Sequence, residues 1–201
     1  MRRLGSGAGI HVYRLFTRRL ANEPAPEPAP GIAISLVSME EMIDLCGTAS
    51  AEMSAETVRA AFSRGEVCAA ATDAGRLVGY CWFTRRAAPH FGGAWMDFDP
   101  RVVYTYRAFV VASHRGRRLV RSLYLAADQE FADQGCSRML ACIESHNRAS
   151  ARAAERAGFG PAGWLAYARW GQRLFLLRTP SVAQAGFRFY VPASRGSEGS
   201  K

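Results

Sequence analysis

The chain has 201 residues, of which 49% are hydrophobic and 11% aromatic, a composition that is ordinary for one globular domain and excludes wholesale disorder. Its 26 basic residues outnumber the 17 acidic ones and give a formal net charge of +9, and every basic residue except Lys201 is arginine. Because arginine presents a planar fork of donors that suits phosphate and carboxylate groups, the charge favours an anionic ligand or partner. No window approaches the roughly 20 apolar residues that a membrane-spanning helix needs.

The five cysteines and four histidines lack the spacing of a zinc site. We therefore expect no metal and reduced, buried thiols, as in a cytoplasmic protein. The N-terminal residues have no continuous apolar core, so they do not resemble a secretory signal, but their arginines leave an organellar transit peptide open.

The N-terminal part of the chain is expected to be an extension. The apolar residues of segment 11–20 fit either a short amphipathic helix or an edge strand. The alternating prolines of segment 23–30 require an extended spacer, so we expect the compact domain to begin near Gly31.

Helix and strand patterns alternate through the middle of the chain. In chain order we predict a strand at 31–38, helices at 39–49 and 54–64, strands at 67–73, 76–86 and 101–112, a helix at 116–134, a strand at 138–144, a helix at 148–157, and strands near 162–170 and 173–178. This order predicts a mixed α/β domain with helices covering a central sheet. Segment 101–112 is rich in β-branched and aromatic residues on both faces, so we expect a central strand covered on both sides.

Beyond these elements, the alternation in segment 184–192 predicts an extra strand, and the small polar residues after it predict a flexible tail. We therefore divide the chain into an N-terminal extension with a Pro-rich linker, one domain, and an extra strand with a tail, at residues 1–30, 31–178 and 179–201.

Segment 109–124 is expected to bind an anion. It is a strand that turns through Arg115-Gly116 into a helix, and the first backbone N–H groups of a helix lack partners and favour negative charge. Four arginines surround this turn: Arg115, Arg117, Arg118 and Arg121. They are either part of an anion site or a solvated face.

Segment 144–160 is a strand end, a short Ala-rich helix and a Gly-Phe pair. Asn147 is a natural N-cap for this helix and Gly158 a natural C-cap. Taken alone, Asn147 is explained by capping.

Together the two segments resemble the GNAT superfamily of acyl-CoA-dependent N-acyltransferases. That family has a strand, a Gln/Arg-x-x-Gly-x-Gly/Ala loop and a helix, and further along a strand and an Asn that opens a helix ending in Gly-Phe. Arg115 begins the first of these motifs here, and the residues from Asn147 to Phe159 match the second. The resemblance covers about residues 31–178.

The resemblance implies a GNAT fold, with a mixed and mostly antiparallel sheet of roughly six or seven strands and about four flanking helices. The sheet would splay between the strands 101–112 and 138–144. It also implies acetyl-CoA or another acyl-CoA as acyl donor, a primary amine of a small molecule or protein as acceptor, and no metal. The residues it assigns to the donor are Phe109, Val110, Val111, Arg115, Gly116, Arg117, Arg118, Leu119, Val120 and Asn147.

The sequence departs from the family at three positions. Arg118 and Val120 replace the two small residues of the first motif, and a β-branched Val120 crowds the approach of a pyrophosphate. Ala154 replaces a tyrosine that often acts as general acid. The remaining candidates for proton transfer are Tyr167, Glu144 and His146. Arg107, inside an otherwise apolar strand, should have a partner or a ligand.

Two alternatives follow from these departures. The donor could be an acidic acyl carrier protein with a long acyl chain, or the chain could be a GNAT-like binding module without catalysis. We do not expect nucleic acid as a partner, because no element interleaves basic and stacking aromatic residues. The acceptor would contact residues 42–65 and 164–173, and a homodimer could form through the terminal strands.

Overall fold

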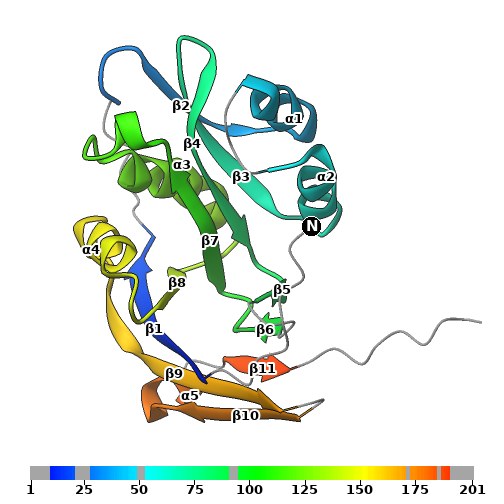
Figure 1. Cartoon of the computed structure of the whole chain (residues 1–201), viewed down its shortest axis with the longest axis vertical. Coiled ribbons are helices and arrows are strands. Elements are labelled where there is room, and N and C mark those ends of the chain that lie inside the picture. Colours follow the sequence, from blue (N-terminus) through cyan, green and yellow to red (C-terminus); the bar gives the residue numbers. More distant parts are fainter. Residues whose placement is uncertain are drawn as a thin grey trace, which may run out of the picture.

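The computed structural model describes residues 10–20, 28–48, 53–90, 95–170, 173–184 and 187–190. These residues form a mixed α/β structure in which helices cover a large, mostly antiparallel sheet, and a small second sheet lies beside it (Figure 1). This is the predicted fold class. Among the described residues no helix has the length and apolarity needed to cross a membrane, and no three potential ligands gather into a metal site.

The large sheet has eight strands. In spatial order they are β10 (Arg173–Arg178), β9 (Gly160–Trp170), β1 (Ile10–Arg19), β8 (Arg138–Glu144), β7 (Val102–Val110), β4 (Arg76–Thr84), β3 (Val67–Asp73) and β2 (Ile32–Val37). Only the pair β7–β8 is parallel. The second sheet contains β11 (Arg188–Tyr190), β6 (Trp95–Asp97) and β5 (Ala88–Pro89). The helices are α1 (Met39–Thr48), α2 (Ala55–Ser63), α3 (Leu119–Asp133), α4 (Arg148–Arg156) and α5 (Pro180–Gln184).

Strand β1 corrects our expectation for segment 11–20, which is neither a helix nor an edge strand. It lies inside the sheet, where Tyr13 is opposite Glu144 of β8 on one side and Leu165 of β9 on the other. Leu15 and Phe16 are fully buried. The sheet therefore includes a strand that precedes the Pro-rich linker, and a compact unit that starts at Gly31 would leave it out. It also has eight strands, more than the six or seven that we expected.

The first two helices begin at capping residues that can be recognised in the sequence. Glu41 accepts a hydrogen bond from Ser38 N at 2.7 Å while Ser38 Oγ accepts one from Glu41 N at 3.2 Å, which is the predicted capping box of α1. Ser54 caps α2, since its side chain accepts a hydrogen bond from Thr57 N.

Helix α3 covers one face of β2, β3, β4 and β7, and α1 packs on β4 from the other face (Figure 1).

A β-bulge separates the two halves of β7. Tyr106 pairs with Trp82 and Phe109 pairs with Tyr80, so two residues of β7 face one residue of β4. Arg107, one of these two, has a left-handed φ of 50°. The parallel pairing of β7 with β8 ends at Thr105, and the strands diverge beyond it. The second half of β7 is therefore exposed or half-buried rather than covered on both sides, as we had expected.

Three further elements differ from the prediction. Helix α3 begins at Leu119 rather than 116, because a 3-10 turn at Ala112–His114 and two left-handed residues precede it. The predicted loop 87–100 contains the short strands β5 and β6, and the C-terminal strand β11 pairs with β6. Helix α5, which we did not predict, packs on β9. The C-terminal tail and Glu52 of the expected acceptor region lie outside the described residues.

Candidate active site

Two adjoining cavities occupy the gap that opens where β7 and β8 diverge. The larger has a volume of about 690 Å³ and lies at the N-terminus of α3, and the other, of about 480 Å³, lies over the middle of β7. They share a set of lining residues: Ala108, Val120, Asn147, Ser150 and Ala153. The cavities therefore form one continuous groove from the loop before α3 to the centre of the sheet.

The loop between β7 and α3 presents backbone N–H groups to the larger cavity. Gly116 and Arg118 have left-handed φ angles of 83° and 59°, and Arg118 occupies the N-cap position without a side-chain capping bond. The N–H groups of Leu119 and Val120 have no partner within the helix, and both residues line the cavity. This terminus offers donors and the positive end of the helix dipole to an anion.

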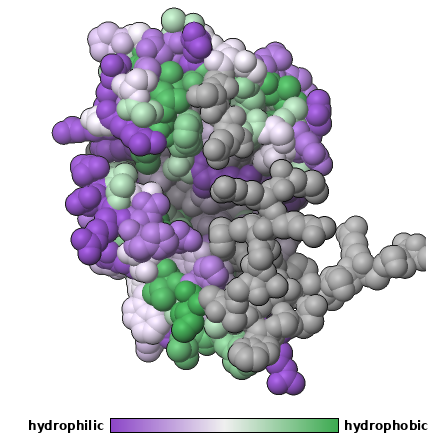
Figure 2. Space-filling view, in the orientation of Figure 1, coloured by the Kyte–Doolittle hydropathy of each residue, from purple (hydrophilic) through white to green (hydrophobic). Residues whose placement is uncertain are grey.

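Arginine side chains dominate the wall of the larger cavity, and no carboxylate lines it. The four arginines are Arg115, Arg118, Arg121 and Arg156. None of the ion pairs recorded among the described residues involves them. The surface over α4 and the loop before α3 is accordingly dominated by hydrophilic residues (Figure 2). Four guanidinium groups without an ion-pair partner among the described residues, around free N–H donors, suit a ligand with several negative charges.

The two ends of the loop before α3 are tied to strands. His114 Nε2 lies 2.9 Å from Asp73 Oδ2 on β3, and Arg115 Nε donates to Val110 O at 3.2 Å. The second bond shows that the Val110 carbonyl faces the groove. Val111 N donates to Val78 O of β4 at 2.9 Å, and because successive residues of a strand alternate in direction, the N–H of Val110 also faces the groove.

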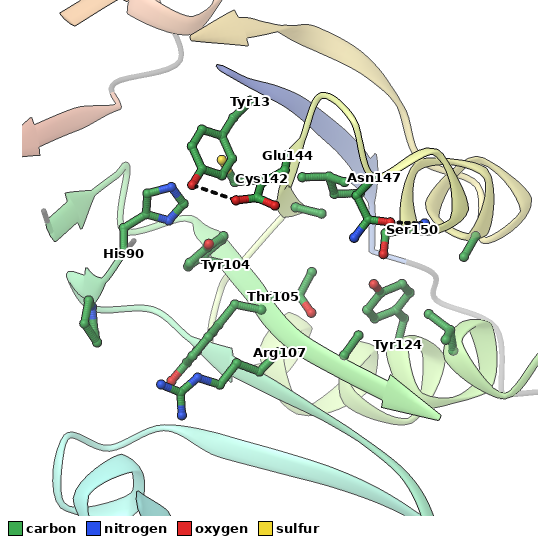
Figure 3. A pocket seen from close by; sticks show the side chains of 17 residues that line it. Tyr13, His90, Tyr104, Thr105, Arg107, Tyr124, Cys142, Glu144, Asn147 and Ser150 are labelled. Carbon is green, nitrogen blue, oxygen red and sulfur yellow. Dashed lines mark hydrogen bonds between the residues drawn. The ribbon is translucent and has the colours of Figure 1, made fainter. Parts of the chain in front are cut away.

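Asn147 lines both cavities at the start of α4. Its Oδ1 accepts a hydrogen bond from Ser150 N at 3.1 Å, so it is the N-cap that the sequence indicated. Figure 3 shows the amide nitrogen on the other side of the group, directed into the groove. One side chain can therefore cap the helix with its oxygen and donate to a ligand with its nitrogen.

Glu144 is the carboxylate residue that lines the smaller cavity, at the end of β8. Tyr13 Oη donates to its Oε1 at 3.4 Å (Figure 3). On the other side of the carboxylate, His146 Nε2 lies 3.2 Å from Oε2. His146 itself is exposed and does not line the cavity. The carboxylate is thus held by two neighbours at the edge of the groove, where it can accept a proton.

His90 lies across the smaller cavity from β8, with its ring centroid 4.7 Å from that of Tyr13. Its Nε2 is buried and has no hydrogen-bond partner among the described residues. Burial lowers the pKa of His90 to about 4, and His11 adds a smaller effect in the same direction. The imidazole is therefore neutral at pH 7.

Tyr167 lies behind the cavity rather than in its wall. It is 2% exposed, belongs to the core, and stacks on Tyr13 with a centroid distance of 5.8 Å. Burial raises the pKa of Tyr167.

Cys142 lines the smaller cavity. Burial raises the pKa of its thiol, which keeps the thiol protonated and unreactive.

The structure brings most of the sequence-derived donor residues together. Eight of the ten line the larger cavity: Phe109, Val110, Arg115, Gly116, Arg118, Leu119, Val120 and Asn147. Val111 and Arg117 do not. The left-handed φ of Arg118 explains the family's glycine at this position, since glycine adopts that conformation without strain.

Sequence reasoning missed Tyr13, His90 and Arg156. Tyr13 was assigned to an extension outside the domain, and His90 to a loop. No local signal identifies them, because each reaches the cavity only through the pairing of distant segments. Arg156 could have been found, since it lies near the C-terminus of the helix that Asn147 opens.

Comparisons with known proteins agree with this architecture. A model of the acetyltransferase (GNAT) family matches residues 36–159, whereas no curated protein matches the chain significantly. A GCN5-related N-acetyltransferase from Kribbella flavida matches with a TM-score of 0.52 and 19% identity, over 86% of this chain and 60% of that one. One from Sphaerobacter thermophilus matches with a TM-score of 0.53 and 17% identity, over 84% and 52%.

This chain therefore spans between about half and two thirds of the lengths of such structures, and at these identities the likeness shows the fold. The family model covers more than half of the chain, including both segments around the groove. The chain belongs to the GNAT family of acetyltransferases.

Proposed function

We propose that the protein is an N-acyltransferase that moves an acyl group, acetyl in the simplest case, from acyl-CoA to a primary amine. The observation that carries the proposal is the continuity of the two cavities. An arginine-lined recess at the N-terminus of α3 leads past Asn147 to the cavity that holds Glu144. A long ligand with phosphates at one end and a reactive group at the other suits this groove.

The residues of the larger cavity fit the CoA part of such a donor. The N–H groups of Leu119 and Val120 would hold the pyrophosphate, and the unpaired arginines would neutralise the phosphate charges. The amide nitrogen of Asn147 would donate to the pantetheine arm. Val120 lies where the two cavities meet, since it lines both.

When bound, acyl-CoA supplies an activated thioester. The N–H of Val110 faces the groove and would stabilise negative charge on the carbonyl oxygen. Glu144 would accept the proton of the attacking amine, with Tyr13 and His146 holding the carboxylate in place. The amine nitrogen forms a bond to the carbonyl carbon, the carbon–sulfur bond breaks, and the sulfur leaves as thiolate.

A thermal shift titration of the full chain tests donor binding, with acetyl-CoA, dephospho-CoA, pantetheine and an acyl carrier protein as ligands. A ligand at about one hundred times its Kd adds roughly 2.7 kcal/mol of stability. At about 2 to 4 °C per kcal/mol this is a shift of several degrees. We expect the shift to be largest with acetyl-CoA and to weaken as the nucleotide is trimmed.

The matched variants are Arg156→Ala and Arg152→Ala. Both arginines are exposed on α4, but only Arg156 lines the larger cavity. Arg156→Ala should weaken the acetyl-CoA shift and Arg152→Ala should not. A shift with the carrier protein and none with CoA would instead make the donor a protein, and no shift with either would leave a binding module. Either result contradicts the proposal.

A further inference from the structure

Arg107 occupies a backbone conformation that its residue type does not favour. Its φ of 50° is required by the bulge, which places Arg107 and Ala108 opposite a single residue of β4. A left-handed conformation is unfavourable for a residue other than glycine, because its Cβ comes too close to the following carbonyl oxygen. Glycine or asparagine would satisfy the bulge at less cost, so this cost is offset only if the arginine side chain has a use.

The guanidinium group of Arg107 has no anionic partner within the described residues. Arg107 is exposed and lines the smaller cavity, and its guanidinium carbon lies 5.8 Å from the centroid of the Tyr106 ring. No recorded ion pair or side-chain hydrogen bond of the described residues involves it. It does not line the larger cavity, so it stands apart from the four arginines at the nucleotide end.

The smaller cavity therefore has one cationic and one anionic wall. Among the described lining residues Arg107 is the one arginine and Glu144 the one carboxylate residue, and His90 is neutral. Figure 3 shows Arg107 on β7 and Glu144 at the end of β8, with the guanidinium group of Arg107 pointing away from Glu144. The surface between them is largely aromatic. Such a site suits a small molecule that carries an amine and a carboxylate together.

We propose that Arg107 binds a carboxylate of the acyl acceptor, so that the acceptor is an amino acid or a similar amine that bears a carboxylate. This inference rests on the proposed acyltransferase function and specifies its substrate class. The guanidinium fork pairs with a carboxylate through two parallel hydrogen bonds, which fixes the orientation of the molecule. The amine then faces Glu144, which accepts its proton as the nitrogen bonds to the carbonyl carbon and the thiolate leaves.

The test compares three forms of the same acceptor in a thiol-release assay with acetyl-CoA. Phenylalanine, phenylalaninamide and 2-phenylethylamine make one set, and leucine, leucinamide and 3-methylbutylamine make a second. The amide is less basic than the acid, so more of it is neutral and ready to attack. A preference for the acid over the amide therefore reports on carboxylate binding. We expect kcat/KM to favour the acid by roughly tenfold or more, as for a charge-assisted hydrogen bond.

The variant Arg107→Gly removes the guanidinium and leaves a residue that accepts the left-handed φ, so it should fold at least as well as the parent chain. We expect it to lose the preference for the acid while its activity on the amide is largely kept. Arg107→Lys retains the charge without the fork and should keep part of the preference. Arg59→Ala, an exposed arginine on α2 that lines neither cavity, is the control and should change neither ratio.

Three outcomes would overturn the carboxylate site. They are equal kcat/KM for acid and amide in the parent chain, an unchanged preference in Arg107→Gly, and thiol release with the decarboxylated amines but not with the acids. All three leave the acyltransferase proposal standing, because thiol is still released. A chain that gives no thermal shift with acetyl-CoA and no thiol release with any amine overturns both.

Discussion

Arg18 on β1 and Asp128 on α3 form a bidentate ion pair inside the protein. Arg18 Nη2 lies 2.6 Å from Asp128 Oδ1 and Nη1 lies 2.8 Å from Oδ2, and both side chains are at most 5% exposed. The guanidinium carbon also lies 5.3 Å from the centroid of the Phe159 ring. The pair links β1, which carries Tyr13 into the groove, to α3, whose N-terminal residues line the larger cavity.

Removing one member of this pair should destabilise the fold strongly. Asp128→Ala leaves the Arg18 charge buried, and such a change costs about 3 to 5 kcal/mol. We expect urea denaturation to show a loss of this size in the free energy of unfolding. The control is Arg101→Ala, which breaks the exposed pair with Asp99 and should cost less than about 1 kcal/mol. Similar losses in the two variants would contradict the prediction.

Arg118→Gly should stabilise the protein by about 1 kcal/mol, because glycine adopts the left-handed φ at this position without strain. The matched control is Arg117→Gly. Arg117 neighbours it in the same loop but is not among the residues with positive φ, so there the extra backbone freedom of glycine should destabilise the fold. Thermal unfolding of the two variants should give shifts of opposite sign, and a lower melting temperature for Arg118→Gly would rule out the strain argument.

Substitutions at Asn147 should separate helix capping from ligand binding. Asn147→Asp keeps an oxygen for Ser150 N and removes the amide donor, so it should preserve stability and weaken acetyl-CoA binding. Asn147→Ala removes both groups, and loss of the cap should cost about 1 kcal/mol. Paired measurements of melting temperature and acetyl-CoA affinity check this. If Asn147→Asp binds acetyl-CoA as well as the parent, Asn147 is a cap and nothing more.

His90 should make stability depend on pH. Its pKa is lowered to about 4 in the folded protein, whereas an unfolded histidine titrates near 6.5. Between these values the unfolded chain binds more protons, so this contribution to stability is complete above about pH 6.5 and is lost as pH falls towards 4. A shift of this size corresponds to about 3 kcal/mol.

The variant His90→Phe keeps an apolar ring beside Tyr13 and removes the titration. The free energy of unfolding of this variant should depend less on pH between about 4 and 6.5 than that of the parent. A parent protein whose stability does not fall over this range would contradict the assignment.

Short-range sequence patterns were sufficient to predict most of the helices and strands. Apart from β5 and β6, the strands and helices from β2 to β10 lie close to their predicted ranges, because each is encoded by a short-range pattern such as the capping box of Ser38 and Glu41. Segment 11–20 was predicted poorly, because its place in the sheet does not follow from a short-range pattern. Its alternation of arginines and apolar residues fits an edge strand, and the burial of Arg18 depends on Asp128, which lies far away in the chain.

The sequence by itself determined the family motifs, the excess of arginine around the helix that follows β7, and the capping role of Asn147, because these depend on residues close together in the chain. Only the tertiary structure decided that β1 enters the sheet beside β8, which brings Tyr13 to Glu144. It also placed Arg107 and Glu144 in the wall of the same cavity and left the Nε2 of His90 buried without a partner among the described residues. These relations depend on strand pairing and divergence, which bring together residues whose separation in the sequence carries no periodic signal.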